Sequence, residues 1–198
     1  MKPTLRIELK SLYGQSVLSG SKNGEAFLPK LLDAAKHQPA DAAVALDFGK
    51  LELVTASFFR AAFRPFRDYA RNGVGFYPLF ANANRDTLDE IRHFAEDVGD
   101  AFLFGTLTKE GEIKETFVVG TLDDKQAKTL AALLRLGEAD AGQLFKEYPD
   151  PDVSSSAAWS NRLAALAAKG FLVERSEGRV KKYRTIHKGL AYGTKLRP

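Results

Sequence analysis

The chain has 198 residues, a length that allows two modest domains or one large one. Its 44% apolar and 27% charged content excludes a disordered protein, and the absence of cysteine excludes disulfides, thiolate metal sites and cysteine nucleophiles. No stretch has the length of a signal-peptide apolar region or of a membrane span, so we expect a cytoplasmic protein with no membrane partner.

The first 120 residues alternate between short apolar runs and amphipathic helical patterns. The runs TLRIELK, DAAVALDFG and VGFYPLFAN predict strands, and AFLFGTLTKEGEIKETFVVG predicts a hairpin around KEGE. Helices are predicted for GEAFLPKLLDAAKH, which follows a turn at SGSKNG, for TASFFRAAFRPFRDYARNG, which is interrupted at Pro65, and for NRDTLDEIRHFAEDVGD. This order predicts an α/β domain with a mostly parallel or mixed sheet, ending near Gly120.

The remaining residues predict three helices followed by a hairpin. The helices are DDKQAKTLAALLRLG, closed by Gly137, then DAGQLFKEY and SAAWSNRLAALAAKG, and the hairpin is FLVERSEGRVKKYRTI around SEGR. Three helices and a small basic hairpin are typical of a winged helix-turn-helix domain. We therefore expect two domains, residues 1–120 and 121–198, joined at residues 121–124.

The charge of the chain, +4 in total, is unevenly distributed between these domains. Residues 1–120 carry 15 Lys/Arg and 16 Asp/Glu, whereas residues 121–198 carry 14 and 9. From 153 to 198 ten bases face only two acids, a net charge of +8. Such asymmetry predicts a near-neutral module followed by one that meets a polyanion.

The third helix of the second domain has the pattern of a DNA-reading helix. Trp159, Leu163 and Leu166 form a narrow apolar stripe, while small and polar residues occupy the rest of its N-terminal half. The hairpin adds basic residues that suit the phosphate backbone or the minor groove. The expected DNA contacts are Ser155, Ser156, Ser160, Asn161, Arg162, Arg175, Arg179, Lys181, Lys182 and Arg184.

The segment SAAWSNRLAALAAKGFLVERSEGRVKKYRTI resembles winged-helix regulators of the broad MarR and ArsR-like sort. The shared features are a Ser/Asn/Arg cluster, the helix-to-wing passage RLAALAAKGFLVER and a glycine-tipped basic wing ending in tyrosine. The resemblance covers residues 123–186 and implies double-stranded DNA as the partner. Because specific DNA binding commonly uses two half-sites, a homodimer is expected. A winged helix that binds protein instead is the alternative.

The stretch VALDFGKLELVTASFFRAAF resembles STAS-like domains, particularly a bacterial STAS-like family of unknown function. It shares an aspartate-ended strand, a short loop and a small-residue step into an amphipathic helix. In anti-sigma-factor antagonists of that superfamily a partner kinase phosphorylates the serine at this step. The resemblance implies Ser57 as phosphoacceptor, Thr55 beside it, and a histidine-kinase-like ATPase as partner. Phe58 departs from the glycine of that pattern, and the other interpretation is that Thr55 or Ser57 caps the helix while Asp47 orders the loop.

Catalytic and metal sites are not expected. His37, His93 and His187 are isolated from further metal ligands, and no nucleophile is accompanied by a positioned base. The glycines of residues 73–75 do not form a dinucleotide-binding loop, and no cofactor is expected. The leading hypothesis is a DNA-binding transcriptional regulator with a STAS-like sensory or protein-interaction domain. The alternatives are a partner-switching regulator of an anti-sigma or histidine-kinase-like ATPase, and a small-ligand or nucleotide sensor using the strand ends at residues 47–57 and 77–84.

Overall fold

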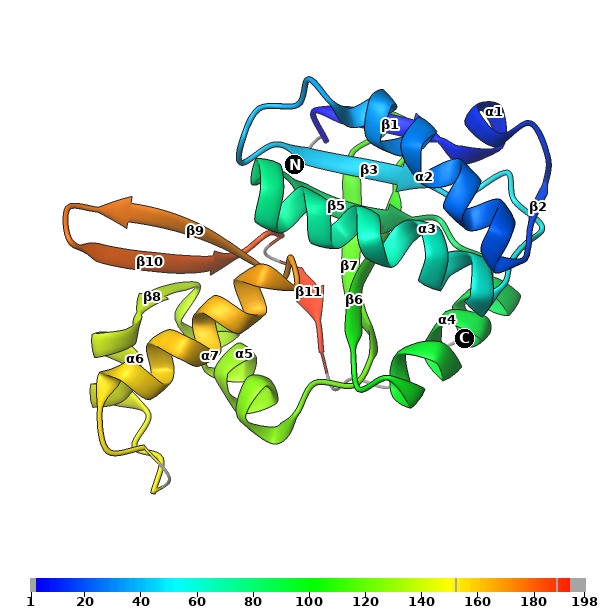
Figure 1. Cartoon of the computed structure of the whole chain (residues 1–198). Helices are drawn as coiled ribbons and strands as arrows, with labels where there is room; N and C mark the ends of the chain where they lie inside the picture. The colour runs from blue at the N-terminus through cyan, green and yellow to red at the C-terminus, as the bar shows by residue number, and fades with distance from the viewer. Residues whose placement is uncertain (1–2, 152, 188, 193–198) are drawn as a thin grey trace.

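The fold is built on a parallel-rich six-stranded sheet with strand order β1-β3-β5-β6-β7-β11 (Figure 1). A computed structural model describes residues 3–151, 153–187 and 189–192. The first four strands run parallel, β7 is antiparallel to β6, and β11 is parallel to β7. Their bounds are β1 Leu5–Glu8, β3 Ala43–Asp47, β5 Tyr77–Ala81, β6 Ala101–Leu107, β7 Ile113–Gly120 and β11 Leu190–Ala191. The chain is thus a mixed α/β protein, as its alternating patterns predict.

One face of this sheet is covered by the helices of the first 120 residues. They are α1 Leu9–Tyr13, α2 Ser21–Ala35, α3 Ala56–Tyr69 with a π-helical turn at Ala70–Val74, and α4 Arg85–Asp97; β2 Val17–Leu18 and β4 Leu53–Val54 form a separate pair. The core on this side is rich in phenylalanine. Phe59 of α3 packs edge-on against Phe102 of β6, with ring centroids 4.9 Å apart, and also contacts Phe80 and Phe63.

Two helices differ from their predicted bounds. The predicted turn SGSKNG contains the first turn of α2, which begins at Ser21. Pro65 lies inside α3 and does not interrupt it. An internal proline costs about 3 kcal/mol, but burial of a phenylalanine side chain contributes about 1.5–3 kcal/mol, and the α3 residues Phe58, Phe59, Phe63 and Phe66 are all fully buried. Packing therefore outweighs the local preference.

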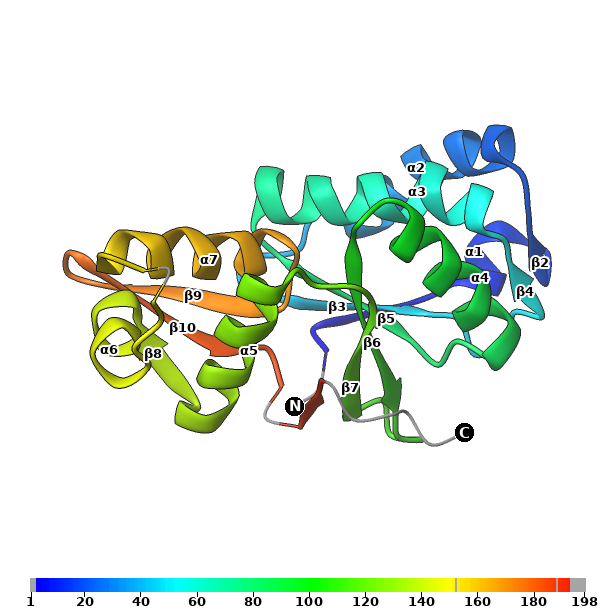
Figure 2. The same cartoon turned by 90° about the horizontal axis from the view of Figure 1, so that it is seen from below.

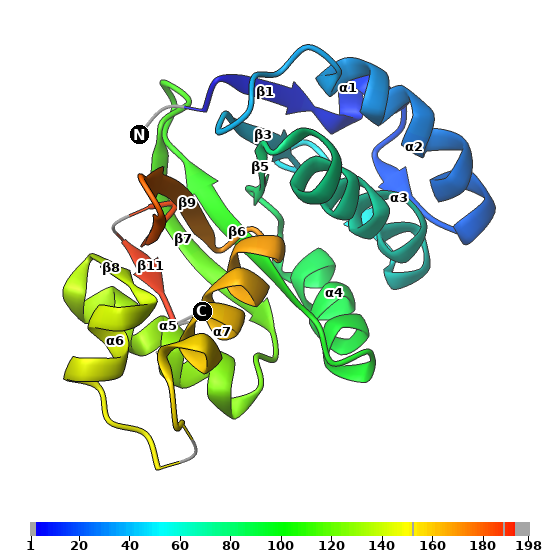
Figure 3. The same cartoon turned by 60° about the vertical axis from the view of Figure 1, so that its left-hand side comes forward.

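The opposite face of the sheet is covered by the C-terminal elements, as Figure 3 shows. These are α5 Asp124–Leu136, β8 Glu138–Asp140, α6 Ala141–Glu147, α7 Ser156–Ala168, β9 Leu172–Glu177 and β10 Val180–Thr185, followed by β11. The strands form an antiparallel sheet of order β8-β10-β9. All three predicted helices and the hairpin are confirmed, whereas β8 and β11 have no counterpart in the prediction.

The two groups of elements share a core across the junction at residues 121–124. Successive side chains of a strand point to opposite faces, and on β6 Phe102 and Phe104 join the phenylalanine core while Leu103 points the other way. Leu103, with Leu79 of β5, belongs to the same apolar cluster as Leu163 of α7. The junction separates two sequence patterns, but the packing continues across it.

The close approach of α2 and α3 yields a test of this packing. A Cβ atom at Gly24 of α2 would lie 2.8 Å from the Ala61 Cβ and 2.9 Å from the Phe58 carbonyl oxygen. By helix propensity alone, Gly24→Ala would stabilise the helix by about 1 kcal/mol. We nevertheless expect the unfolding free energy of the protein to fall by about 1–3 kcal/mol, because the added methyl group overpacks this contact. Urea unfolding measures the sign, and a stabilised variant would contradict this contact.

Candidate nucleic-acid interface

Helix α7 presents one face to the core and a different, small-residue face to solvent. Its buried positions include Trp159, Leu163 and Leu166. Its exposed positions recur at intervals of three and four residues, which places them in one stripe, namely Ala157, Ser160, Asn161, Ala164 and Ala168. The predicted positions Ser155, Ser156, Ser160 and Asn161 are therefore all exposed on or beside this stripe.

The N-terminus of α7 lacks a side-chain cap. Its neighbours α5 and α6 are capped by Asp123 and Asp140, which accept hydrogen bonds from the backbone N–H groups of Gln126 and Gln143 at 2.8 and 2.9 Å. Ser155 occupies the N-cap of α7, but its side chain makes no such bond, and the first turn holds no acidic residue. The first N–H groups of α7 can thus meet an external acceptor, at the positive end of the helix dipole.

The β9–β10 hairpin projects from the rest of the chain, as Figures 1 and 2 show, and bears the other predicted contacts. Lys181 pairs with Glu174 at 2.7 Å and Lys182 with Glu177 at 3.0 Å, so the hairpin partly neutralises its own charge. The hydrogen bond and charge of Glu177 raise the pKa of Lys182. Three exposed arginines form no ion pair with any described residue and carry the remaining charge: Arg175, Arg179 and Arg184.

Arg162 does not take the exposed position that the sequence pattern predicts. Only 8% of it is exposed, its guanidinium donates to the Asp150 carboxylate at 2.8 Å, and its Cζ lies 5.0 Å from the centroid of the Trp159 ring. Position 162 lies three residues after Trp159 and four before Leu166, beside the apolar stripe. Arg162 therefore fixes the turn between α6 and α7 and is removed from the set of expected DNA contacts.

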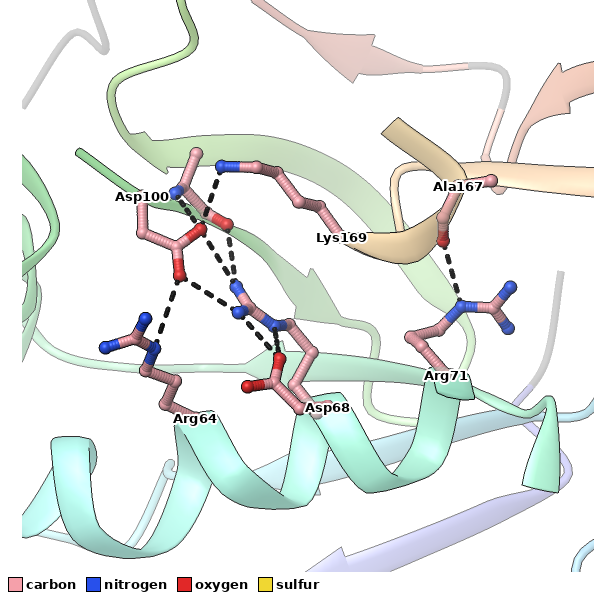
Figure 4. A network of polar contacts seen from close by, with 8 residues as sticks. Arg64, Asp68, Arg71, Asp100, Ala167 and Lys169 are labelled. Carbon is pink, nitrogen blue, oxygen red and sulfur yellow. Dashed lines mark hydrogen bonds and ion pairs between the residues drawn. The ribbon is translucent and has the colours of Figure 1, made fainter. Parts of the chain in front are cut away.

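A buried ionic network around Asp100 holds the C-terminal end of α7 to residues 1–120, which we call the first module (Figure 4). The Asp100 carboxylate accepts hydrogen bonds from Lys169, just after α7, at 2.9 Å and from both terminal nitrogens of Arg67 of α3 at 2.9 and 3.2 Å. Nε of Arg64 lies 3.6 Å from Oδ2 of Asp100. Burial by itself raises the pKa of Asp100, but the bonds and charges of Arg67 and Lys169 lower that pKa to about 2. No local sequence pattern indicates this network, because Lys169 and Asp100 are 69 positions apart.

A second polar contact joins the same segments. Arg71 donates from Nε to the Ala167 carbonyl oxygen at 3.0 Å, in addition to the hydrogen bond that this carbonyl accepts from the backbone N–H of Gly170 at 3.0 Å. Its guanidinium lies 3.7 Å from the centroid of the Tyr77 ring. The Tyr77 hydroxyl in turn accepts a hydrogen bond from the backbone N–H of Glu174 at 3.3 Å. Both α7 and β9 are thus anchored to the first module.

The candidate phosphoacceptor lies at the N-terminus of α3. Thr55 caps this helix by accepting from the Phe58 N–H at 3.4 Å, and Ser57 Oγ lies 3.1 Å from Thr55 Oγ1. The Glu90 carboxylate accepts from the Ala56 N–H at 2.9 Å. The N-cap interpretation of Thr55 is confirmed. A phosphate on Ser57 would meet an anionic side chain already bound at this helix end, so its role as phosphoacceptor stays a prediction from resemblance.

The strand ends near Asp47 form a closed set of hydrogen bonds. Asp47 accepts from the backbone N–H of Gly49, from Nδ2 of Asn82 and from Nε of Arg6, at 2.8–2.9 Å. The side-chain oxygen of Asn82 accepts from the Leu107 N–H at 2.9 Å. Asp47 therefore orders the loop that follows its strand, as the sequence interpretation holds, and these groups bind one another.

Comparison with known proteins assigns no family to the chain. Scans against protein-family models and against curated proteins found no match. Within the described ranges, no group of three or more His, Asp or Glu side chains is arranged to hold a metal ion. Among the same residues, none of the helices is long and apolar enough to cross a membrane.

The depressed pKa of Asp100 gives a pH-dependent contribution to stability. Asp100 is ionised at lower pH when folded, with a pKa of about 2 against 3.8 for an ordinary aspartate. It therefore stabilises the fold above the ordinary pKa, and about 2 kcal/mol is lost as the pH falls toward the folded value. We expect Asp100→Asn to lower the unfolding free energy at pH 7 by about 3–5 kcal/mol, because Arg67 loses its buried partner.

Urea unfolding between neutral and strongly acidic pH measures both effects. The matched control is Asp68→Asn, since Asp68 also pairs with Arg67 but is 48% exposed; we expect a loss below about 1 kcal/mol. Parallel stability curves for wild type and Asp100→Asn across the acidic range would contradict the assignment.

Proposed function

We propose that the chain is a DNA-binding transcriptional regulator, with a winged helix-turn-helix domain at residues 121–198 and a STAS-like sensory or protein-interaction domain at residues 1–120. The order helix, strand, helix, helix, strand, strand from α5 to β10 supports the first part of the proposal. The order of parallel strands and covering helices before it supports the second. Within this proposal α7 is the recognition helix and the β9–β10 hairpin is the wing.

The observation that carries the proposal is the exposed stripe of α7 beside a hairpin with unpaired arginines. Small side chains along the stripe allow the helix backbone to approach the floor of a major groove about 12 Å wide. Asn161 is the stripe residue whose amide can form the bidentate pair with adenine. Ser156 and Ser160 offer hydroxyls to phosphates or bases.

Phosphate binding is divided between the two ends of this surface. The uncapped first turn of α7 directs backbone N–H groups outward, an arrangement that suits a phosphate. Arg179 follows Gly178 in the hairpin turn and is exposed, so it is placed for the DNA backbone or the minor groove. Arg175 and Arg184 add charge nearer the hairpin base. Lys181 and Lys182 must give up their glutamate partners before they bind phosphate, and we rank them below the arginines.

The proposed complex contains two copies of the chain, because a single recognition helix reads only a short half-site. The first module is held to α7 through Asp100 and Arg71, so any ligand or partner that changes its position is coupled to the reading helix. Binding to that module is therefore the proposed route by which DNA affinity is regulated.

Charge removal at the wing tests the phosphate contacts. We expect Arg179→Ala to weaken binding to all DNA sequences and to reduce the slope of log affinity against log salt by about 0.9, the value for one phosphate contact. Lys30→Ala is the matched control, since Lys30 is an exposed cation on α2, outside this surface, and it should leave the slope unchanged. Fluorescence anisotropy with labelled duplexes across a salt series measures both. Absence of any salt-dependent complex at low salt would refute DNA binding.

A second variant tests base reading. Random-sequence DNA selection first identifies the preferred site of the wild type. Asn161→Ala should then lose about 1–3 kcal/mol on that site, and much less on unrelated duplexes, so its sequence preference relaxes at one base pair. Equal losses on both kinds of DNA would show that Asn161 does not read a base.

A further inference from the structure

A shallow hollow lies between α5 and the turn that joins α6 to α7. Its volume is about 280 Å³. The apolar part of its wall comes from Ala132 of α5, from Trp159 of α7, and from Tyr148, Pro149 and Pro151 of the turn. Asp150 also lines it, but that carboxylate is bound to Arg162. The hollow is smaller than the roughly 300–1,000 Å³ of sites for drug-sized ligands, so it suits a single inserted side chain.

The tryptophan of this hollow has an unused hydrogen-bond donor. Trp159 is 2% exposed, and its indole N–H is buried without an acceptor among the described residues. Buried polar groups are nearly always hydrogen-bonded, so an unpaired donor calls for an explanation. Because this nitrogen is sealed from solvent, it is not a contact point for an occupant of the open hollow, and Trp159 contributes only apolar wall.

Two cations flank the apolar part. Lys128 and Arg135 line the hollow, are exposed, and form neither an ion pair nor a hydrogen bond with any described side chain. They are seven residues apart on α5, so they lie on the same side of the helix and about 10 Å apart along its axis. Since the charge of Asp150 is balanced by Arg162, the rim of the hollow is cationic.

We propose that this hollow binds an extended acidic segment of a partner protein, which inserts one aromatic side chain and pairs carboxylates with Lys128 and Arg135. In an extended segment alternate residues point to the same side. The pattern acid, any residue, aromatic, any residue, acid therefore presents all three side chains to the hollow. The two carboxylates then lie within reach of the long, flexible Lys128 and Arg135 side chains, and the aromatic ring acts as a central anchor.

The site is independent of the proposed DNA surface. Trp159 belongs to the buried stripe of α7, whereas Ser160 and Asn161 belong to its exposed stripe on the other side of the helix. A peptide in the hollow and a duplex on α7 can thus be bound together. The acidic-peptide site is testable whether or not the chain binds DNA.

A fluorescence titration tests the proposal directly, because Trp159 is the one tryptophan in the sequence. The probe is a capped synthetic peptide containing Asp-Ser-Phe-Ser-Asp, added to the full chain. We expect the fluorescence emission of Trp159 to change with peptide concentration and to reach a plateau. Arg135→Gln and Lys128→Gln should each weaken binding about threefold to fivefold, the effect of losing one exposed ion pair. Lys125→Gln, which removes an exposed cation of α5 outside the hollow, should leave the affinity unchanged.

Peptides with Asn in place of both Asp residues, or with Ala in place of Phe, should bind much more weakly. Equal binding of the neutral peptide, equal binding by Arg135→Gln, or no change in emission at millimolar peptide would overturn the proposal. Analytical ultracentrifugation, which measures the oligomeric state, distinguishes a partner peptide from a second copy of the chain in the hollow. If the wild type dimerises and Arg135→Gln is monomeric, a second copy of the chain covers the hollow, and the acidic-peptide site is refuted.

Discussion

Strands β5 and β6 are apolar on both faces, and the architecture follows from the need to cover both. On one side the rings of Phe80, Phe102 and Phe104 pack under α3 and its neighbours. On the other side Leu79 and Leu103 would be exposed to water if the C-terminal elements did not lie over them. Burial of apolar area is the main favourable term in folding. The C-terminal module therefore shares the second apolar cluster with the sheet of the first module and is not carried on a free linker.

The polar contacts at the seam between the modules fix how this second layer sits. An apolar interface alone tolerates sliding, whereas Asp100 requires Arg67 and Lys169 at hydrogen-bond distance, and Arg71 requires the end of α7. Displacing Arg67 from Asp100 separates two buried charges, which is costly. The network thus links the position of α7 to that of α3, and the proposed regulation through the first module depends on this link.

The C-terminal module has two different surfaces separated by its own core. One comprises the small-residue stripe of α7 and the arginines of the hairpin, which suit the proposed contact with a polyanion. The other is the cationic hollow at α5, with Trp159 in its wall. Trp159 belongs to the buried side of α7, so the two surfaces do not overlap.

The sequence by itself determined every helix except the short α1, most strands, both hairpins and the basic character of the C-terminal end, because periodicity, turn residues and charge are local properties. Only the tertiary structure decided which charged side chains form buried ion pairs. In the linear pattern Arg162 is similar to its exposed neighbours Ser160 and Asn161. In the structure it is buried, and it pairs with Asp150 in the turn between α6 and α7. Lys169 resembles any surface lysine until the fold brings Asp100 beside it. The two-residue strand β11 exists only because β7 is there to pair with it. Such partners lie 12 to 74 positions apart, where the topology, rather than any local pattern, sets the contact.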